Sequence, residues 1–129
     1  MDNREVLIDN KEIIIEFNVA FDKGVSNDIA RFVTDDFEWH MLGDSVIKGK
    51  DNFLQFFVDH PDMKMISVTK DHIIVDGNTA SLDGEVQCTD KSGKIYDMYY
   101  CDVYELENGL IKKMISYTVD KNKASVSNT

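Results

Sequence analysis

Cysteine, proline and long apolar runs are scarce in this sequence, and each shortage excludes a class of protein. Only two of the 129 residues are cysteine and one is proline. Cys88 and Cys101 are too few for a disulfide framework, and neither lies in a Cys-x-x-Cys pair or beside a histidine at metal-ligand spacing. No apolar run approaches the roughly 20 residues that span a bilayer, and the first ten residues lack a signal-peptide pattern. We therefore expect a cytoplasmic protein with reduced thiols.

Basic residues are also few relative to acidic ones. The chain has 14 lysines and arginines against 24 aspartates and glutamates, a formal net charge of −10. A surface of that charge repels a phosphate backbone and an anionic membrane. Neither a nucleic acid nor a membrane is therefore expected as a partner, and the charge is attributed to solubility.

The length and hydrophobic content are those of one globular domain. Hydrophobic residues make up 43% of the 129 residues, and a chain of this length is expected to bury one core and to hold one cavity. The last residues are small and polar, as in a frayed terminus. We expect a single domain over residues 1–121 and a flexible tail over residues 122–129.

The first half of the sequence indicates three helices with one strand among them. Apolar spacing predicts a helix from Arg4 to Lys23, ended by Gly24. Ser26-Asn27-Asp28 supplies N-cap groups for a short second helix. Alternation over Phe37–Leu42 predicts a strand. The apolar residues of Lys50–Asp59 then predict a third helix, which stops before the only proline.

The second half is dominated by strand patterns. Met63–Val75 is rich in isoleucine and valine, and Thr79–Cys88 alternates between apolar and polar residues. Glycine-containing turns then lead into Lys94–Glu105 and Leu110–Val119. The predicted fold class is α+β, with three N-terminal helices packed on one face of a strongly curved antiparallel sheet.

Three stretches in this order carry a resemblance to a known family. They are VTDDFEWHMLGDSVIKGKDNFLQFF, DGNTASLDGEV and YELENGLIKKMISYTVD. Together they resemble the nuclear transport factor 2-like superfamily, in its SnoaL-like and ketosteroid isomerase-like branch, from about Asp9 to Asp120. The resemblance implies a cone-shaped fold with one internal pocket, lined by alternate strand residues. It also implies a homodimer formed through the outer face of the sheet.

The resemblance allows the isomerase residues to be sought one by one. The isomerase tyrosine falls at Phe17, and the base aspartate falls at either His40 or Met41. The donor aspartate, eight residues before Gly109, falls at Cys101. None of the three groups that stabilise and protonate an enolate is kept, so steroid isomerase chemistry is not expected.

Residues important to two other branches are also replaced. The aspartate that SnoaL-like cyclases often carry falls at Val119, with Asp120 one residue further on. That shift of one residue turns a side chain to the opposite face of a strand. No arginine follows Arg31, so the Asp-Arg-Asp set of the epoxide hydrolase is missing as well.

Candidate catalytic residues remain on two strands. Because Cys101 matches a pocket position, Asp97 and Tyr99 are expected to point inward or toward the pocket mouth. A buried carboxylate there would have a raised pKa and could serve as base, although a hydrogen-bonded residue at the rim is the simpler interpretation of Asp97. Tyr99 would be the matching proton donor, although a wall tyrosine is the simpler interpretation. His40 has a pKa suited to a general base, but alternation groups it with Glu38, away from Trp39 and Met41.

The other face of the same strand is expected to be external. Met98, Tyr100 and Tyr104 share it with Asp102, and with Tyr117 and Met114 they would form an outward aromatic patch suited to dimerisation. The three histidines are scattered, without partners at ligand spacing, so neither a metal nor a cofactor is expected.

Three hypotheses follow. The first is a binding module for a small hydrophobic molecule, with a mostly apolar pocket lined by Phe17, Trp39, Met41, Phe53, Phe57 and Cys101. The second is a SnoaL-like enzyme with acid–base chemistry on a small carbonyl compound, using Asp97 or His40 as base and Tyr99 as donor. The third is a protein-interaction module that uses the outer sheet face. An ionisable side chain inside the cavity would favour the second over the first.

Overall fold

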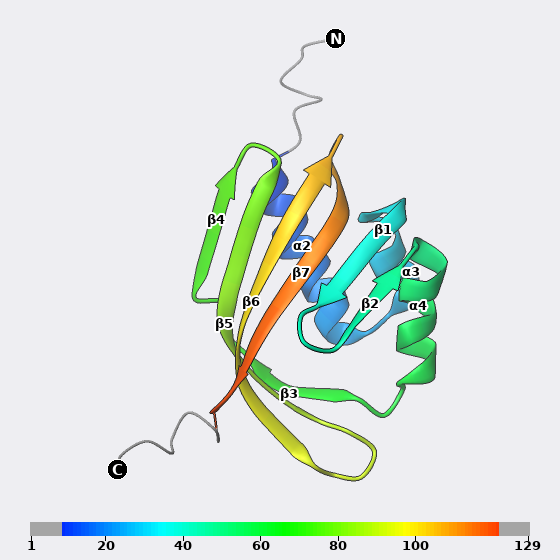
Figure 1. Ribbon diagram of the computed structural model, residues 1–129, viewed down its shortest axis with the longest axis vertical. Helices are drawn as coiled ribbons and strands as arrows, with labels where there is room; N and C mark the ends of the chain where they lie inside the picture. The colour runs from blue at the N-terminus through cyan, green and yellow to red at the C-terminus, as the bar shows by residue number, and fades with distance from the viewer. Residues whose placement is uncertain (1–8, 122–129) are drawn as a thin grey trace.

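The computed structural model describes residues 9–121 and shows helices packed on one face of a seven-stranded sheet (Figure 1). The helices are α2 (Asn10–Lys23), α3 (Ser26–Ala30) and α4 (Lys50–Asp59). The strands are β1 (Val33–Met41), β2 (Ser45–Lys48), β3 (Lys64–Val68), β4 (His72–Asp76), β5 (Thr79–Thr89), β6 (Ile95–Glu107) and β7 (Leu110–Asp120). Among the described residues, no helix is long and apolar enough to cross a membrane.

The sheet is mixed rather than purely antiparallel. Its strand order is β2-β1-β7-β6-β5-β3. β3 and β4 both pair with β5, each along a different part of that strand. β1 runs parallel to β7, whereas the other neighbouring strands are antiparallel. The α+β class is therefore confirmed, and the prediction of a wholly antiparallel sheet is wrong at this one pairing. A parallel pair needs a long connection between its strands, and helix α4 with the strands after it supplies that connection between β1 and β7.

Helix α2 has a defined cap at each end. The side chain of Asp9 accepts a hydrogen bond from the backbone N–H of Lys11 at 3.0 Å, and Gly24 ends the helix in the left-handed conformation with φ of 69°. The predicted start at Arg4 lies outside the described residues, as does the predicted tail over residues 122–129. Figure 1 shows α2 lying behind β5, β6 and β7, so it covers one face of their central part.

Two strand predictions needed correction. β1 starts at Val33, earlier than Phe37, and the short strand β2 returns beside it after the turn at Gly43. The predicted strand Met63–Val75 divides into β3 and β4 because the chain crosses closely over β5 at Gly84. A Cβ there would lie 2.1 Å from the backbone oxygen of Thr69, so only glycine fits.

The hydrophobic core lies between the helices and the inner sheet face, which we define as the face that they cover. Phe17, Phe37 and Phe53 have no exposed surface, and the rings of Phe37 and Phe53 lie 4.6 Å apart between centroids. Tyr104 is equally buried and packs edge-on against Phe17. Each buried aromatic ring of this kind stabilises the fold by roughly 1.5–3 kcal/mol relative to an exposed one.

Candidate ligand cavity

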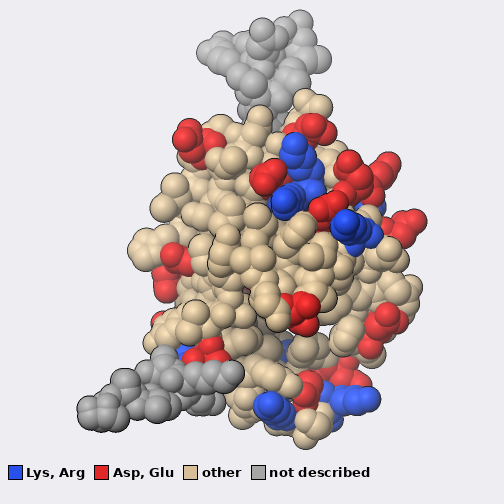
Figure 2. Space-filling view, viewed as in Figure 1, with Lys and Arg blue, Asp and Glu red and all other residues tan. Residues whose placement is uncertain are grey.

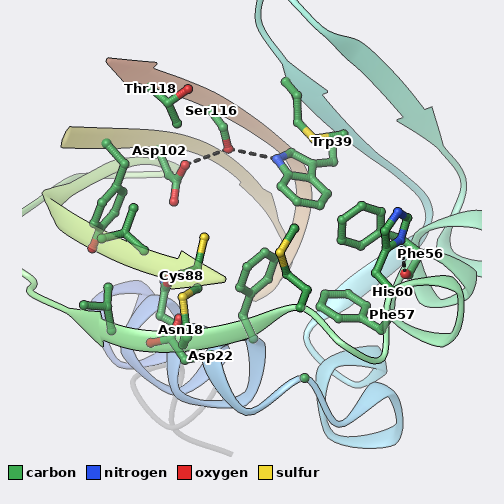
Figure 3. A pocket seen from close by; sticks show the side chains of 18 of the residues that line it. Asn18, Asp22, Trp39, Phe56, Phe57, His60, Cys88, Asp102, Ser116 and Thr118 are labelled. Carbon is green, nitrogen blue, oxygen red and sulfur yellow. Dashed lines mark hydrogen bonds between the residues drawn. The ribbon is translucent and has the colours of Figure 1, made fainter. Parts of the chain in front are cut away.

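Beside this core, helices α2 and α4 and the inner sheet face surround a cavity of about 620 Å³ (Figure 3). Aromatic rings make up one part of its wall: Phe21, Trp39, Phe56, Phe57 and Tyr100. Sulfur-bearing side chains make up another: Met41, Met63, Met65, Met98, Met114 and Cys88. Five of the six methionines in the sequence therefore line this one cavity. Thioether side chains adapt readily to a bound shape.

The structure separates the residues predicted to line a pocket. Trp39, Met41 and Phe57 lie in the cavity wall. Phe17 and Phe53 have no exposed surface and belong to the packed core instead, a correction that follows from their contacts with each other. A strand pattern shows which face a residue takes, but it does not show where along a helix the core ends and a cavity begins.

The predicted faces of β6 are reversed. Asp97, Tyr99 and Cys101 lie on the outer sheet face, whereas Met98 and Asp102 point into the cavity. The reason is that Tyr104 and Leu106 are buried, and alternation from them brings Asp102, Tyr100 and Met98 inward. The prediction took Cys101 as a pocket position, and one residue of difference along a strand exchanges its two faces.

The same reversal corrects the predicted outward aromatic patch. Tyr100, Tyr104, Met98 and Met114 face the interior, and only Tyr117 of that set is exposed, at 47%. The outer face has a hollow of its own, of about 360 Å³, whose lining includes Tyr99, Cys101 and Tyr117.

His40 lies on the other side of β1 from Trp39 and Met41. The ring Nε2 of His40 is 2.8 Å from the carboxylate of Glu38, and that hydrogen bond lowers the pKa of Glu38. His40 is not among the residues that line the cavity. The orientation that alternation predicts for this strand is therefore the one observed, and His40 does not contribute to the cavity wall.

Asp102 is the carboxylate that the cavity does contain. Its Oδ1 accepts a hydrogen bond from the hydroxyl of Ser116 at 2.7 Å, and that same oxygen of Ser116 accepts one from Nε1 of Trp39 at 2.8 Å. Figure 3 shows this chain of two hydrogen bonds, which links β6, β7 and β1 across the cavity wall. The single tryptophan of the sequence is thus connected to Asp102 through one hydroxyl.

Tyr104 and Asn18 form a second set of contacts at Asp102. The hydroxyl of Tyr104 lies 3.5 Å from Asp102 Oδ2, and Asn18 donates from Nδ2 to that hydroxyl at 3.0 Å. The same hydroxyl also lies 3.3 Å from Asn18 Oδ1, so this amide oxygen and the carboxylate compete for its hydrogen. The bond to the carboxylate is long, so it holds Oδ2 weakly and leaves most of its accepting capacity for another partner.

Burial raises the pKa of Asp102 to about 6. The hydrogen bonds from Ser116 and Tyr104 lower this pKa, and the negative charge of Asp22 raises it, but loss of solvation is the largest influence. No lysine, arginine or histidine among residues 9–121 forms an ion pair with Asp102. The carboxyl can therefore change its protonation state close to neutral pH.

Exposed residues mark the mouth of the cavity. Lys64 and Met63 lie there with His60, whose ring stacks on Phe56 at 4.4 Å between centroids. Deeper in the wall, burial raises the pKa of the Cys88 thiol, which makes it a weak nucleophile. Within residues 9–121 no group of three or more histidine, cysteine, aspartate or glutamate side chains could hold a metal ion.

Asp102 and Ser116 are the site residues that sequence reasoning missed. The sequence did contain a pattern that indicates the position of Asp102. Alternation places Asp102 on the same strand face as Tyr104 and Leu106, two large residues that are expected in a core. Ser116 becomes visible only through the strand pairing, in which it lies directly opposite Asp102. That contact depends on the register of β6 with β7, which no local pattern states.

The chain is similar to known proteins in sequence and in fold. The profile of the SnoaL-like domain family matches residues 14–114. The chain therefore belongs to the SnoaL-like domain family, within the nuclear transport factor 2-like superfamily. A search of curated proteins finds no match.

Three solved structures illustrate the likeness. An NTF2-like protein of unknown function from Cytophaga hutchinsonii is 25% identical, with a TM-score of 0.68, over 86% of this chain and 100% of that one. An LEH-like epoxide hydrolase from Mycobacterium tuberculosis is 17% identical, with a TM-score of 0.78, over 88% and 86%. An NTF2-like protein of unknown function from Burkholderia pseudomallei is 15% identical, with a TM-score of 0.73, over 95% and 100%. The last two show the fold alone.

Proposed function

We propose that this protein binds a small, mostly apolar molecule in the cavity, with Asp102 contacting its polar end. The observation that carries the proposal is a cavity of about 620 Å³ with aromatic and thioether walls and a carboxylate inside it. That volume lies in the usual range of ligand sites, about 300–1,000 Å³. Mostly apolar walls with a few polar groups are also typical of such sites. We take this cavity as the pocket that the family resemblance implies for a cone-shaped fold.

A cavity-filling variant tests the binding role. Met98→Trp adds bulk to the inner face of β6, and Tyr99→Trp adds a similar ring to the outer face of the same strand. We expect calorimetric titration with a panel of small aromatic compounds to find binders to the wild type and to Tyr99→Trp, with at least ten-fold weaker binding to Met98→Trp. Equal binding by all three proteins would show that the compounds bind elsewhere.

Acid–base catalysis is a second candidate function, and the pKa of Asp102 favours it. A carboxyl with a pKa of about 6 accepts and returns a proton near neutral pH more readily than an ordinary aspartate. Asp102 takes the role of base here in place of His40 and Asp97, because those two and the predicted donor Tyr99 are not among the residues that line the cavity. The substrate would be a small compound with an acidic C–H or O–H bond directed at Asp102.

Isotope exchange tests this second function without knowledge of the natural substrate. Small ketones are incubated with the protein in D₂O, and loss of their C–H signals is followed by proton NMR. We expect exchange with the wild type and His40→Ala, and none above background with Asp102→Asn. Exchange at the same rate with Asp102→Asn would exclude Asp102 as the base.

A homodimer is proposed through the outer sheet face. This face exposes Tyr99, Tyr117 and Val119, at 48%, 47% and 56%. Figure 2, in the view of Figure 1, shows few charged side chains over the middle of the sheet. Exposed apolar surface of this kind is typical of association sites. Analytical ultracentrifugation is expected to find a dimer for the wild type and a monomer for Tyr117→Lys; a monomeric wild type would exclude the proposal.

The compartment and the excluded partners stay predictions. Cys88 and Cys101 are both unpaired, in keeping with a cytoplasmic protein. The formal charge of −10 opposes nucleic acid and anionic membranes as partners. A binding assay with labelled oligonucleotides at low salt checks the exclusion of nucleic acid, and we expect no bound oligonucleotide.

A further inference from the structure

We propose that the natural ligand is a small organic cation: an apolar, ring-sized body that carries a protonated amine, with the ammonium group paired to Asp102. This inference rests on the proposed binding function, because it names the class of molecule that the same cavity takes. Three independent features support it, namely the unpaired charge of Asp102, the prior use of the hydrogen-bond donors around it, and the aromatic walls.

Asp102 combines loss of solvation inside the cavity with the lack of an ion-pair partner among residues 9–121. Asp22 pairs with Lys70 at 2.9 Å, Asp83 with His72 at 2.8 Å, and Asp97 with Lys121 at 3.2 Å, all near the surface. Asp102 loses enough solvation for its pKa to be raised, and it forms no ion pair within residues 9–121. A desolvated carboxylate without a partner is costly, so a cation inside the cavity would gain more from Asp102 than from an exposed aspartate.

The hydrogen-bond donors around Asp102 are already in use. Ser116 donates to Asp102, and Trp39 donates to Ser116. Asn18 donates to the backbone and to Tyr104, and the Tyr104 hydroxyl has Asn18 Oδ1 and Asp102 Oδ2 as its acceptors. What this network offers a ligand is therefore the free lone pairs of Asp102, which accept hydrogen bonds. An ammonium group supplies donors and positive charge, whereas a carboxylate ligand would be repelled.

The cavity walls suit the body of such a molecule. Trp39 meets Phe21 at 5.4 Å and Phe56 at 5.2 Å between ring centroids, and Phe57 continues the cluster from Phe21 at 5.3 Å. Aromatic faces attract organic cations, more strongly where water is excluded. The methionines on the facing wall can adjust to the shape of the body.

The remaining charged groups do not oppose a cation. The basic residues among those lining the cavity, Lys23, Lys64 and His60, are exposed near the mouth, where solvent screens them. Asp22 and Asp44 lie among the same lining residues and carry the opposite charge. The net charge of −10 also attracts cations to the protein surface.

The test uses three probes of nearly equal size: 2-phenylethylammonium, 2-phenylethanol and phenylacetate. Each is titrated at pH 7.5 into wild type, Asp102→Asn and the matched control Asp97→Asn by calorimetry. We expect the ammonium to bind about ten-fold more tightly than the alcohol, because hydrogen bonds between charged groups are stronger than neutral ones. Phenylacetate should bind weakest. Asp102→Asn should remove the advantage of the ammonium while the alcohol still binds, which also shows that the variant is folded.

The pH dependence gives a second readout on the wild type alone. Ammonium affinity should fall as the pH is lowered from 7.5 to 5, because Asp102 becomes protonated while the amine stays charged. Ser116 from β7 and Tyr104 from β6 contact Asp102, and the charge of Asp22 from α2 acts on its pKa. The other polar groups of the cavity wall nearby are Asn18 from α2, Trp39 from β1, Tyr100 from β6 and Cys88 from β5. Loss of the pH dependence in Asp102→Asn assigns it to this carboxyl rather than to His60 at the mouth.

The outcomes separate the inference from the binding function. Two results would overturn the proposal that the ligand is a cation: the alcohol binds as tightly as the ammonium, or the ammonium affinity is unchanged in Asp102→Asn. Either result leaves the cavity as a binding site. Failure of all three probes to bind, together with failure of the aromatic panel, overturns both. An ammonium advantage that Asp102→Asn removes and Asp97→Asn keeps supports the inference.

Discussion

Asp97 and Asp102 lie on the same strand, β6, but on opposite faces of the sheet, and their surroundings differ completely. Asp97 is on the outer face and pairs with Lys121 at 3.2 Å. Asp102 is on the inner face, where two hydroxyls approach it and burial raises its pKa to about 6. Tyr99 and Tyr104 repeat the contrast, with 48% and 0% of their surfaces exposed.

This difference shows that the residue types of β6 do not assign its chemistry. Both faces offer an aspartate, a tyrosine and a neighbouring sulfur. What distinguishes them is the layer of helices on one side, which removes water and leaves a carboxylate without a cation. A shift of one residue in the strand register would exchange the two sets.

The largest expected effect compares the two tyrosines. Tyr104→Ala removes a fully buried ring that packs on Phe17 and contacts Asn18, so it should lower the free energy of unfolding by about 3–5 kcal/mol. Tyr99→Ala removes an exposed ring and should cost less than about 1 kcal/mol. Urea denaturation measures both. Similar losses at the two positions would mean that the assignment of faces is wrong.

The second prediction compares the two aspartates as the pH changes. Asp102 has a folded-state pKa of about 6, above its unfolded value of 3.8, so the folded protein binds this proton more tightly. The resulting stabilisation is complete below pH 3.8 and is lost as the pH rises through 6. Asp102→Asn should therefore gain stability relative to wild type between pH 4 and pH 7.5, by up to about 3 kcal/mol.

Asp97→Asn is the matched control for this measurement. It breaks a surface ion pair, whose contribution is less than about 1 kcal/mol. Chemical denaturation of the three proteins at several pH values gives the comparison. An Asp102→Asn protein whose stability follows the wild type in parallel across this range would contradict the raised pKa.

A smaller effect is expected from the hydroxyl that joins Asp102 to Trp39. Ser116→Ala removes a hydrogen bond that favours the ionised carboxylate, so the pKa of Asp102 should rise further, by up to about one pH unit. Thr118→Val changes another hydroxyl in the cavity wall and should leave that pKa nearly unchanged. Carbon-13 NMR of the aspartate carboxyls follows both; a downward shift in Ser116→Ala would refute the assigned role.

Local patterns predicted much of the fold. Alternation on β1 placed Trp39 and Met41 on one face and His40 on the other, as observed, because the buried side chains of that strand are themselves apolar. Helix α4 was predicted over Lys50–Asp59 with the observed bounds. The α+β class and the family follow from the order of such segments.

What could not be predicted depends on contacts between distant segments. The division of β3 from β4 comes from the close crossing of Thr69 over Gly84. Both faces of β6 hold polar and apolar residues, so alternation alone does not show which face points inward. The packing of Tyr104 in the core decides which face that is. The link from Trp39 to Ser116 joins residues 77 positions apart, and no local pattern contains it.

The central claim is that Asp102 is a titrating carboxyl inside the cavity, and Trp39 reports on it directly. The sequence has one tryptophan, so its indole N–H gives a single NMR resonance, and that N–H donates to Ser116, which donates to Asp102. A pH titration should move this resonance with a midpoint near 6 in wild type and Asp97→Asn, and not in Asp102→Asn. A resonance that stays constant from pH 4.5 to 7.5, or one that titrates equally in Asp102→Asn, would contradict the account.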